Sequence, residues 1–306
     1  MKPKVCVIIP CRGAGDHLHA CLDSLGAADY PDYEIIVVDD GIEPGRLAEI
    51  RGMKGITVLS SEGRGPSYAR NLAAGKTEAR YVVFTDSDCI VDAGWLSSLM
   101  EGFDVFPDAV GGGGRQELPQ DAGDFQREVF SFMCATGLLT DYARRRESNA
   151  VGEVNHNASC NAVYKRDALL EEGGFLEGLW PGEDVELDYR LRRRGKKLFF
   201  QPASIVYHYK PDSPEKFRRM MFHYGRAQGA LVRRQGGAFR RIHYIPVAVC
   251  VYLLFLIAHP PAALTGIVVA AAGARFYLGN MRQVRLTGEG LFFWNAGFFR
   301  GLFQRI

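Results

Sequence analysis

The first hundred residues alternate short apolar runs with helical patterns, and this alternation constrains the fold more than any other feature of the sequence. The apolar runs are Val5–Ile9, Glu34–Val38, Ile56–Leu59 and Tyr81–Thr85. Each run predicts a strand, and the continuous run Val5–Ile9 predicts a strand that is buried on both faces of a sheet. Strands separated by helices pair in parallel, with helices on both faces. The sequence therefore predicts an α/β domain with a mostly parallel sheet.

Polar residues follow each predicted strand, at the edge of the sheet where ligands bind in α/β proteins. They are Pro10-Cys11-Arg12, Asp39-Asp40-Gly41, Ser60-Ser61 and Asp86-Ser87-Asp88. The carboxylates of Asp86 and Asp88 suit a hard divalent cation, which takes oxygen ligands and bridges to substrate phosphates. An Asp-x-Asp after a strand is also often a turn that caps a helix. The motif alone leaves both interpretations open.

A second acidic pair, Glu183-Asp184, begins a charged helical pattern about a hundred residues later. Carboxylates at a helix start can supply a base that removes a proton. They can also simply cap the helix and complement its dipole. A cation site together with a base is what a transfer reaction with a diphosphate leaving group requires. The order of the two acidic pairs favours that chemistry.

Other features of the sequence exclude several classes of protein. The chain has 37 basic and 35 acidic residues, so nucleic acid is not an expected partner. Its seven cysteines are odd in number and show no paired metal spacing, which favours reduced thiols over disulfides. No helical pattern begins directly after Gly111–Gly114, so these glycines are expected to lie close to a ligand or a strand rather than to cradle a phosphate. No Gly-x-Gly-x-x-Gly follows the first strand, which argues against a nicotinamide dehydrogenase.

The last third of the chain has a different character. Positive charge is concentrated in 210–241, and residues 245–274 contain no Asp, Glu, Lys or Arg. His259-Pro260-Pro261 divides this stretch into runs of 14 and 13 residues, each shorter than the ~20 residues of a perpendicular membrane span. Such runs also occur as buried core helices. Flanking basic residues and an aromatic tail (291–303) favour association with the cytoplasmic face of a membrane.

Five motifs resemble, in their order along the chain, those of inverting family 2 glycosyltransferases of the GT-A fold. They are Val7–Pro10, Ile35–Gly41, Gly65–Asn71, Phe84–Asp88 and Pro181–Leu191. The resemblance covers about residues 4–235 and implies the fold of nucleotide-diphospho-sugar transferases. We expect a catalytic domain at 1–213, a basic amphipathic helix or linker at 214–241, and a hydrophobic hairpin with an aromatic tail at 242–306.

The resemblance also implies roles for individual residues in binding the donor. Asp39 or Asp40 would accept a hydrogen bond from the nucleobase, and Arg70 would contact the base or a phosphate. Further residues assigned to the donor site are Pro10, Arg12, Ser87 and the two carboxylates of the Asp-x-Asp motif. The implied donor is a nucleotide-diphosphate sugar; the resemblance favours UDP as its nucleotide, and dTDP and GDP stay open.

The cation and the base follow from the same resemblance. Asp88, with Asp86 nearby, would hold Mn²⁺ or Mg²⁺ on the donor diphosphate. His208 lies where related enzymes often present a histidine to this metal, although a lone histidine is as often structural. Asp184, accompanied by Glu183, would remove the proton of the acceptor hydroxyl.

These roles imply transfer of a sugar to a hydroxyl of a lipid-linked or cell-surface glycan. The segment 228–232 lacks the Arg and Trp of the motif that processive members carry, so one sugar per encounter is expected. Two alternatives stay open. In a polyprenyl-phosphate glycosyl synthase, the acceptor would be the lipid phosphate itself. In a non-catalytic scaffold, the nucleotide-sugar would be bound without turnover, although the complete set of carboxylates counts against this.

Overall fold

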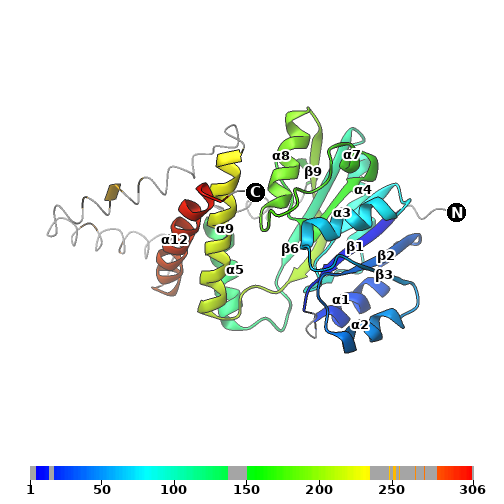
Figure 1. Ribbon diagram of the computed structural model, residues 1–306, viewed down its shortest axis with the longest axis horizontal. Coiled ribbons are helices and arrows are strands. Elements are labelled where there is room, and N and C mark those ends of the chain that lie inside the picture. Colours follow the sequence, from blue (N-terminus) through cyan, green and yellow to red (C-terminus); the bar gives the residue numbers. More distant parts are fainter. Residues whose placement is uncertain are drawn as a thin grey trace. The chain divides into compact units, whose positions relative to one another are not determined.

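The computed structural model of the chain describes residues 5–13, 17–136, 150–234 and 281–304, with positions 248, 251, 252, 255, 266 and 272. Two compact units make up the chain (Figure 1). Unit 1 comprises residues 1–121 and 140–209, and unit 2 comprises 122–139 and 210–306. Unit 1 thus omits 122–139, which the expected catalytic domain included. Most of the expected apolar hairpin lies outside the described residues.

Unit 1 is built on a nine-stranded sheet with the order β3-β2-β1-β4-β8-β6-β9-β5, and β7 pairs with β9. The strands are β1 (Val5–Cys11), β2 (Tyr33–Asp39), β3 (Ile56–Ser60), β4 (Tyr81–Phe84), β5 (Cys89–Val91), β6 (Ala109–Glu117), β7 (Gly152–Glu153), β8 (Ala162–Lys165) and β9 (Lys197–His208). The first four strands pair in parallel, as expected. β5, β7 and β8 run antiparallel to their neighbours, so the sheet is mixed, with the other six strands in one direction.

Helices cover both faces of this sheet, as the alternation of strands and helices predicted. One face carries α1 (His17–Gly26), α2 (Pro44–Arg51) and α4 (Trp95–Val105), and the other carries α3 (Pro66–Lys76), α7 (Arg166–Glu171) and α8 (Glu183–Arg193). Within β1, Val5, Val7 and Ile9 belong to the first hydrophobic core, whereas Cys6 and Ile8 belong to the second. Successive side chains of a strand point to opposite faces, which explains why β1 is apolar throughout.

The four consecutive glycines lie in β6, where they allow close contact with β9. A Cβ atom at Gly112 would stand 2.2 Å from the ring of Phe199, and one at Gly114 would stand 2.2 Å from the carbonyl oxygen of Ser204. Any larger residue would therefore collide with the neighbouring strand. The expectation of close approach to another strand is confirmed. The register between β6 and β9 also shifts between Gly114 and Arg115, so the two strands expected at 197–201 and 205–208 form one strand.

The pairing registers bring the ends of several strands to one edge of the sheet. Cys11 at the end of β1 lies opposite Asp39, and Asp39 lies opposite Ser60. His208 at the end of β9 lies opposite Cys89 at the start of β5. The polar segments that follow β1, β2, β3 and β4 therefore meet at the edge that also carries His208.

Unit 2 contains three described helices around a common apolar core: α5 (Asp124–Thr136), α9 (Pro214–Arg234) and α12 (Met281–Leu302) (Figure 1). Glycines let α9 and α12 approach closely. A Cβ at Gly225 would stand 1.9 Å from the carbonyl oxygen of Trp294, and one at Gly297 would stand 2.0 Å from that of Phe222. Both helices repeat the pattern four residues later, at Gly229 and at Gly301.

The aromatic residues of the tail are divided between the inside and the surface of unit 2. Trp294 and Phe298 are buried in the core formed with α5 and α9. Phe292 and Phe303 are 67% and 82% exposed. Among the helices of the described ranges, none has the length and apolar character needed to cross a membrane.

Candidate active site

Two carboxylates and one imidazole meet at the edge of the sheet described above. Asp86 and Asp88 follow β4, and candidate ligand atoms of Asp86, Asp88 and His208 all lie within 4.8 Å of one another. Asp88 Oδ1 is 3.6 Å from His208 Nε2. The side chains are 30%, 48% and 21% exposed, respectively, so a ligand can reach them. Carboxylate oxygens with one imidazole suit Mn²⁺ or Mg²⁺, and the residues present fit the expected cation.

Arg70 of α3 joins this cluster to the second acidic pair. Its guanidinium donates to Asp86 Oδ1 at 2.8 Å and to Glu183 Oε1 at 2.7 Å. The side chain is 3% exposed, so its ion pair with the buried Glu183 is shielded from water, whereas the pair with Asp86 is partly open. Arg70 Nε has no hydrogen-bond partner among the described residues. The contact of Arg70 with a nucleobase or phosphate stays a prediction. The structure shows in addition that Arg70 lies between the two acidic pairs.

The structure separates the environments of Glu183 and Asp184, which begin α8. Glu183 is buried, and its Oε1 accepts hydrogen bonds from Arg70 and, at 3.5 Å, from Ser159 Oγ. Burial and the neighbouring charge of Asp184 raise the pKa of Glu183 to about 7, although Arg70 opposes this shift. Asp184 is partly exposed. Its two oxygens accept from the backbone N–H groups of Ser159 (3.0 Å) and Val185 (2.8 Å). Asp184 is thus oriented and accessible, whereas Glu183 is enclosed.

The two aspartates after β2 also differ. Asp40 is 2% exposed, and its Oδ1 accepts from Ser61 Oγ (2.6 Å) and from the Gly65 N–H (2.8 Å). It therefore ties the loops after β2 and β3 to the start of α3. Asp39 is partly exposed, and its Oδ1 accepts from the N–H groups of Gly41 (2.9 Å) and Ile42 (2.8 Å). Of the two, Asp39 is the better placed to meet a ligand.

The other residues assigned to the donor site lie near the same edge. Pro10 is buried within β1, Arg12 directly after β1 is exposed, and Ser87 between the two site carboxylates is partly exposed. Their contacts with a nucleotide stay predictions.

We expect Asp39→Asn to weaken binding of the nucleotide donor by about ten- to a hundredfold, the value of one hydrogen bond to a charged group. Asparagine can keep an oxygen on the N–H groups of Gly41 and Ile42, but it replaces the other oxygen with an NH₂ group that cannot accept from a nucleobase. Asp92→Asn is the matched control. Asp92 also forms a turn of this kind, with the Gly94 N–H, and it lies beyond β5, which runs away from this edge. Calorimetric titration with nucleoside diphosphates measures both variants, and an unchanged affinity in Asp39→Asn would exclude contact with the base.

Sequence reasoning missed a buried network around Asp188, one turn beyond Asp184. Asp188 is fully buried, and it accepts from the Asn157 N–H (2.9 Å) and the Tyr164 hydroxyl (2.8 Å) and lies 3.0 Å from His156 Nδ1. This network holds the segment that leads to Ser159, whose N–H orients Asp184. The sequence offered one signal for this network: Asp184 and Asp188 are four residues apart, which places both on one face of a helix.

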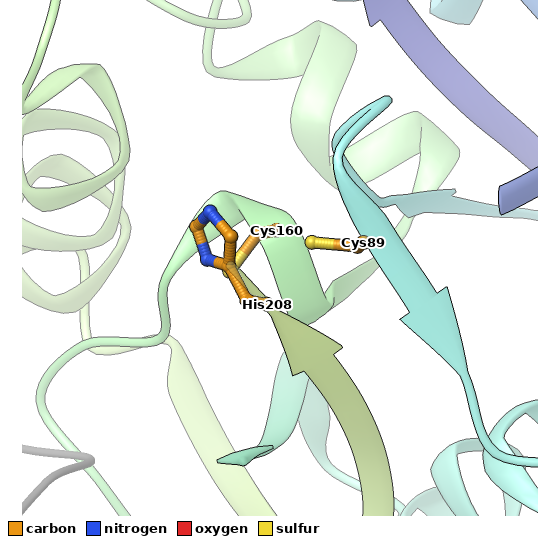
Figure 2. A group of neighbouring side chains, drawn as sticks. All are labelled: Cys89, Cys160 and His208. Atoms are coloured by element: carbon orange, nitrogen blue, oxygen red, sulfur yellow. The ribbon is translucent and has the colours of Figure 1, made fainter. Parts of the chain in front are cut away.

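A pair of thiols beside His208 was missed as well. Cys89, Cys160 and His208 approach one another (Figure 2), and their ligand atoms lie within 4.8 Å of one another. The residues come from separate places in the chain, so their linear spacing gave no indication of a cluster.

Sequence comparisons agree with this geometry. The model of glycosyl transferase family 2 matches residues 6–173, which is more than half of the chain. A pre-mycofactocin glycosyltransferase of Mycobacterium tuberculosis is 29% identical over 243 residues, which are 75% of this chain and 48% of that protein. The chain thus spans about half the length of that relative. A Methanococcus voltae protein, named dolichyl N-acetyl-alpha-D-glucosaminyl phosphate 3-beta-D-2,3-diacetamido-2,3-dideoxy-beta-D-glucuronosyltransferase, is 21% identical over 98% of this chain and 97% of its own length.

Solved structures show the same fold. The mannosyltransferase PcManGT of Pyrobaculum calidifontis, in complex with GDP-Man and Mn²⁺, has a TM-score of 0.71 and 19% identity over 99% of this chain and 88% of its own. GalNAc-T7 with UDP, GalNAc and Mn²⁺ has a TM-score of 0.55 and 17% identity over 77% of this chain and 51% of its own. The mixed sheet, its two layers of helices and these likenesses show a GT-A-like fold, and the family match shows that the chain belongs to glycosyl transferase family 2.

Proposed function

We propose that the chain transfers one sugar from a nucleotide-diphosphate donor to an acceptor hydroxyl, with inversion at the anomeric carbon. The observation that supports this best is the position of Arg70. It contacts Asp86 of the cation cluster and Glu183 beside Asp184, so one side chain links a candidate diphosphate site to a candidate base. The proposed donor is a UDP-sugar, and a GDP-sugar is the alternative, since similar structures contain either UDP or GDP-Man.

Each step of the proposed reaction has a residue suited to it. Asp86, Asp88 and His208 would hold Mn²⁺ or Mg²⁺, which stabilises the charge on a departing diphosphate as a Lewis acid. Asp39 would fix the nucleobase. Asp184 would accept the proton of the acceptor hydroxyl while the new C–O bond forms on the face opposite the breaking bond to the diphosphate. The transition state is oxocarbenium-like. Attack on the face opposite the breaking bond inverts the anomeric centre.

A lipid-linked glycan is the proposed acceptor. The names of two relatives, the Methanococcus voltae protein and a glucosyl-dolichyl phosphate glucuronosyltransferase of Haloferax volcanii, include sugars linked to dolichyl phosphate. The rival is transfer to a lipid phosphate itself. A phosphate is already ionised and needs no strong base, so the accessible and oriented carboxylate of Asp184 favours a hydroxyl acceptor.

We place this activity at the cytoplasmic face of a membrane. Phe292 in α12 and Phe303, which directly follows it, are exposed, and close helix contacts through Gly-x-x-x-Gly patterns, as between α9 and α12, are common among membrane helices. Flotation of the full chain with anionic lipid vesicles measures the association. Recovery of all the protein in the lipid-free fraction, at low salt and without detergent, would contradict this location.

A donor panel tests the proposed reaction. The full chain is incubated with UDP- and GDP-sugars, with and without Mn²⁺, and with either a lipid-linked saccharide or a polyprenyl phosphate as acceptor. We expect Mn²⁺-dependent transfer to the saccharide and an inverted anomeric configuration of the product by NMR. Transfer to the polyprenyl phosphate alone would establish the rival enzyme. Donor binding without turnover on any acceptor would establish a scaffold, and retained configuration would rule out the proposed mechanism.

A further inference from the structure

Two buried thiols and the imidazole of the cation cluster converge from three elements. Cys89 begins β5 and His208 ends β9, and the two residues lie directly opposite each other in the antiparallel pair. Cys160 lies in the short 3₁₀ helix η1 (Ser159–Asn161) that precedes β8. Figure 2 shows the three side chains as neighbours, and their ligand atoms lie within 4.8 Å of one another.

The surroundings of this thiol cluster (Cys89, Cys160 and His208) resemble those of a metal site more than those of a surface thiol pair. Cys89 is fully buried and Cys160 is 4% exposed, whereas the side chain of His208 is 21% exposed. Neither cysteine forms a disulfide in the part of the chain that the structure describes. The cluster is therefore closed on the side of the protein and open at the histidine. Three protein ligands with one open position are a common arrangement for zinc.

The chemistry of the ligands separates this cluster from the carboxylate cluster beside it. Thiolates prefer soft ions such as Zn²⁺, whereas carboxylates suit Mn²⁺ and Mg²⁺. His208 belongs to both groups. Its Nδ1 lies 3.3 Å from Gln116 Oε1, and its Nε2 lies 3.6 Å from Asp88 Oδ1. The two groups share one imidazole, so a zinc ion held by the thiols fixes the orientation of its ring and competes with a cation held by Asp86 and Asp88.

We propose that Cys89, Cys160 and His208 bind one zinc ion, and that this binding withdraws His208 from Asp86 and Asp88 and weakens the site for the Mn²⁺ or Mg²⁺ cofactor. Binding converts two thiols to thiolates and releases two protons. Zinc therefore inhibits sugar transfer instead of supporting it. The inhibitory effect rests on the proposed function, but the binding site does not.

Cobalt tests the binding site directly, because Co²⁺ replaces Zn²⁺ and its bonds to thiolates give a charge-transfer absorption that carboxylate ligands do not give. We expect the full chain, kept reduced, to show this absorption up to one equivalent of Co²⁺ and to lose it when Zn²⁺ is added. Cys89→Ser and Cys160→Ser should each abolish the absorption. Cys6→Ser is the matched control, since Cys6 is also fully buried in a strand of unit 1.

Competition between Zn²⁺ and Mn²⁺ can be measured without an assay of sugar transfer. Free Mn²⁺ gives a strong EPR signal, so release of Mn²⁺ by Zn²⁺ is measurable in the wild-type protein. In Cys160→Ser, the zinc concentration needed for release should rise at least about tenfold, as expected for the loss of an interaction at a metal site. If transfer activity is found, each variant's inhibition by zinc is compared with its own zinc-free rate, and Cys160→Ser should resist zinc to the same degree.

Several results would overturn the proposal. Absence of the cobalt absorption in reduced protein with a normal melting curve would eliminate the site. Its persistence in a folded Cys89→Ser/Cys160→Ser double variant would assign it to other thiols. Zinc binding that releases no Mn²⁺ would retain the site and refute the competition. If no donor is turned over, the cobalt and EPR results still decide the binding question, so failure of the proposed function is distinguishable from failure of the zinc site.

Discussion

Replacing Asp184 with asparagine should lower the rate of sugar transfer by about 10²–10⁴-fold, the usual contribution of a general base, and leave donor affinity almost unchanged. Asparagine has the same shape, but its single oxygen can accept from only one of the N–H groups of Ser159 and Val185, and it cannot take up the acceptor proton. Loss of the other hydrogen bond and of one negative charge in the first turn of α8 should cost about 1–3 kcal/mol of stability. Single-turnover kinetics, donor titration and a melting curve measure the three quantities on one variant.

Glu183→Gln is the matched control for this prediction, because the two carboxylates are adjacent but differ in environment. Glu183 is buried against Arg70, and its pKa is raised to about 7, so above that pH its ionised carboxylate weakens the fold and a neutral isostere removes this cost. The oxygen of glutamine can still accept from Arg70. At about one pH unit above the pKa of Glu183, Glu183→Gln should therefore be at least as stable as the wild-type protein and lose less activity, and Asp184→Asn should be the slower enzyme. A folded, donor-binding Asp184→Asn protein with wild-type turnover would remove Asp184 from the mechanism.

Replacing Asp88 with asparagine should abolish the Mn²⁺-dependent thermal stabilisation that a nucleoside diphosphate gives to the wild-type protein. Replacing a residue that only orients a metal ligand already lowers metal affinity by about 10–100-fold. Loss of the charge of a ligand itself should therefore lower metal affinity by at least about 100-fold. The side chain of Asp88 is 48% exposed and contacts His208, so the fold itself should be little affected. Melting temperatures with and without Mn²⁺ and the nucleotide separate the two effects.

Asp104→Asn serves as the control for Asp88→Asn, since it removes the same charge from an exposed position on α4. It should leave the Mn²⁺-dependent shift at its wild-type size. Asp86→Asn should change both metal binding and stability, because Asp86 also accepts a hydrogen bond from Arg70. Loss of the Asp86 charge leaves the buried Arg70 paired with the carboxylate of Glu183. A full wild-type shift in Asp88→Asn would show that Asp88 is not a ligand.

The parts of the fold that follow from local periodicity were predictable from the sequence. The apolar runs that became β1 and β4 are buried on both faces, and those of β2 and β3 are at least partly buried on both faces apart from Thr57 and Ser60, so each run carries its own signal. The sequences of the later strands contain a weaker signal, because the pairing of these strands depends on partners that are distant in the chain. Nothing near residues 197–208 indicates that β9 continues through 202–204, since the shift of register against β6 that permits this lies at Gly114 and Arg115.

The site shows the same division between local and distant information. Asp86, Asp88, Glu183 and Asp184 stand in short motifs, and the sequence was sufficient to identify them as candidates. It could not distinguish Asp39 from Asp40, because the burial of Asp40 is created by Ser61 and Gly65 on a different loop. The thiol cluster was beyond reach for the same reason: the residues belong to three segments that only the antiparallel half of the sheet brings together.

The composition of unit 2 has a consequence for how the chain is made. Within the part of the chain that the structure describes, the apolar face of α5, with Val129, Phe132 and Met133, packs against helices that begin at Pro214 and Met281. During synthesis at about 5–20 residues per second, that face leaves the ribosome on the order of 10 s before α12 does. Contacts so distant in sequence form late in folding. A nascent chain, or one truncated before α12, therefore presents an uncovered apolar helix that invites aggregation or the binding of chaperones.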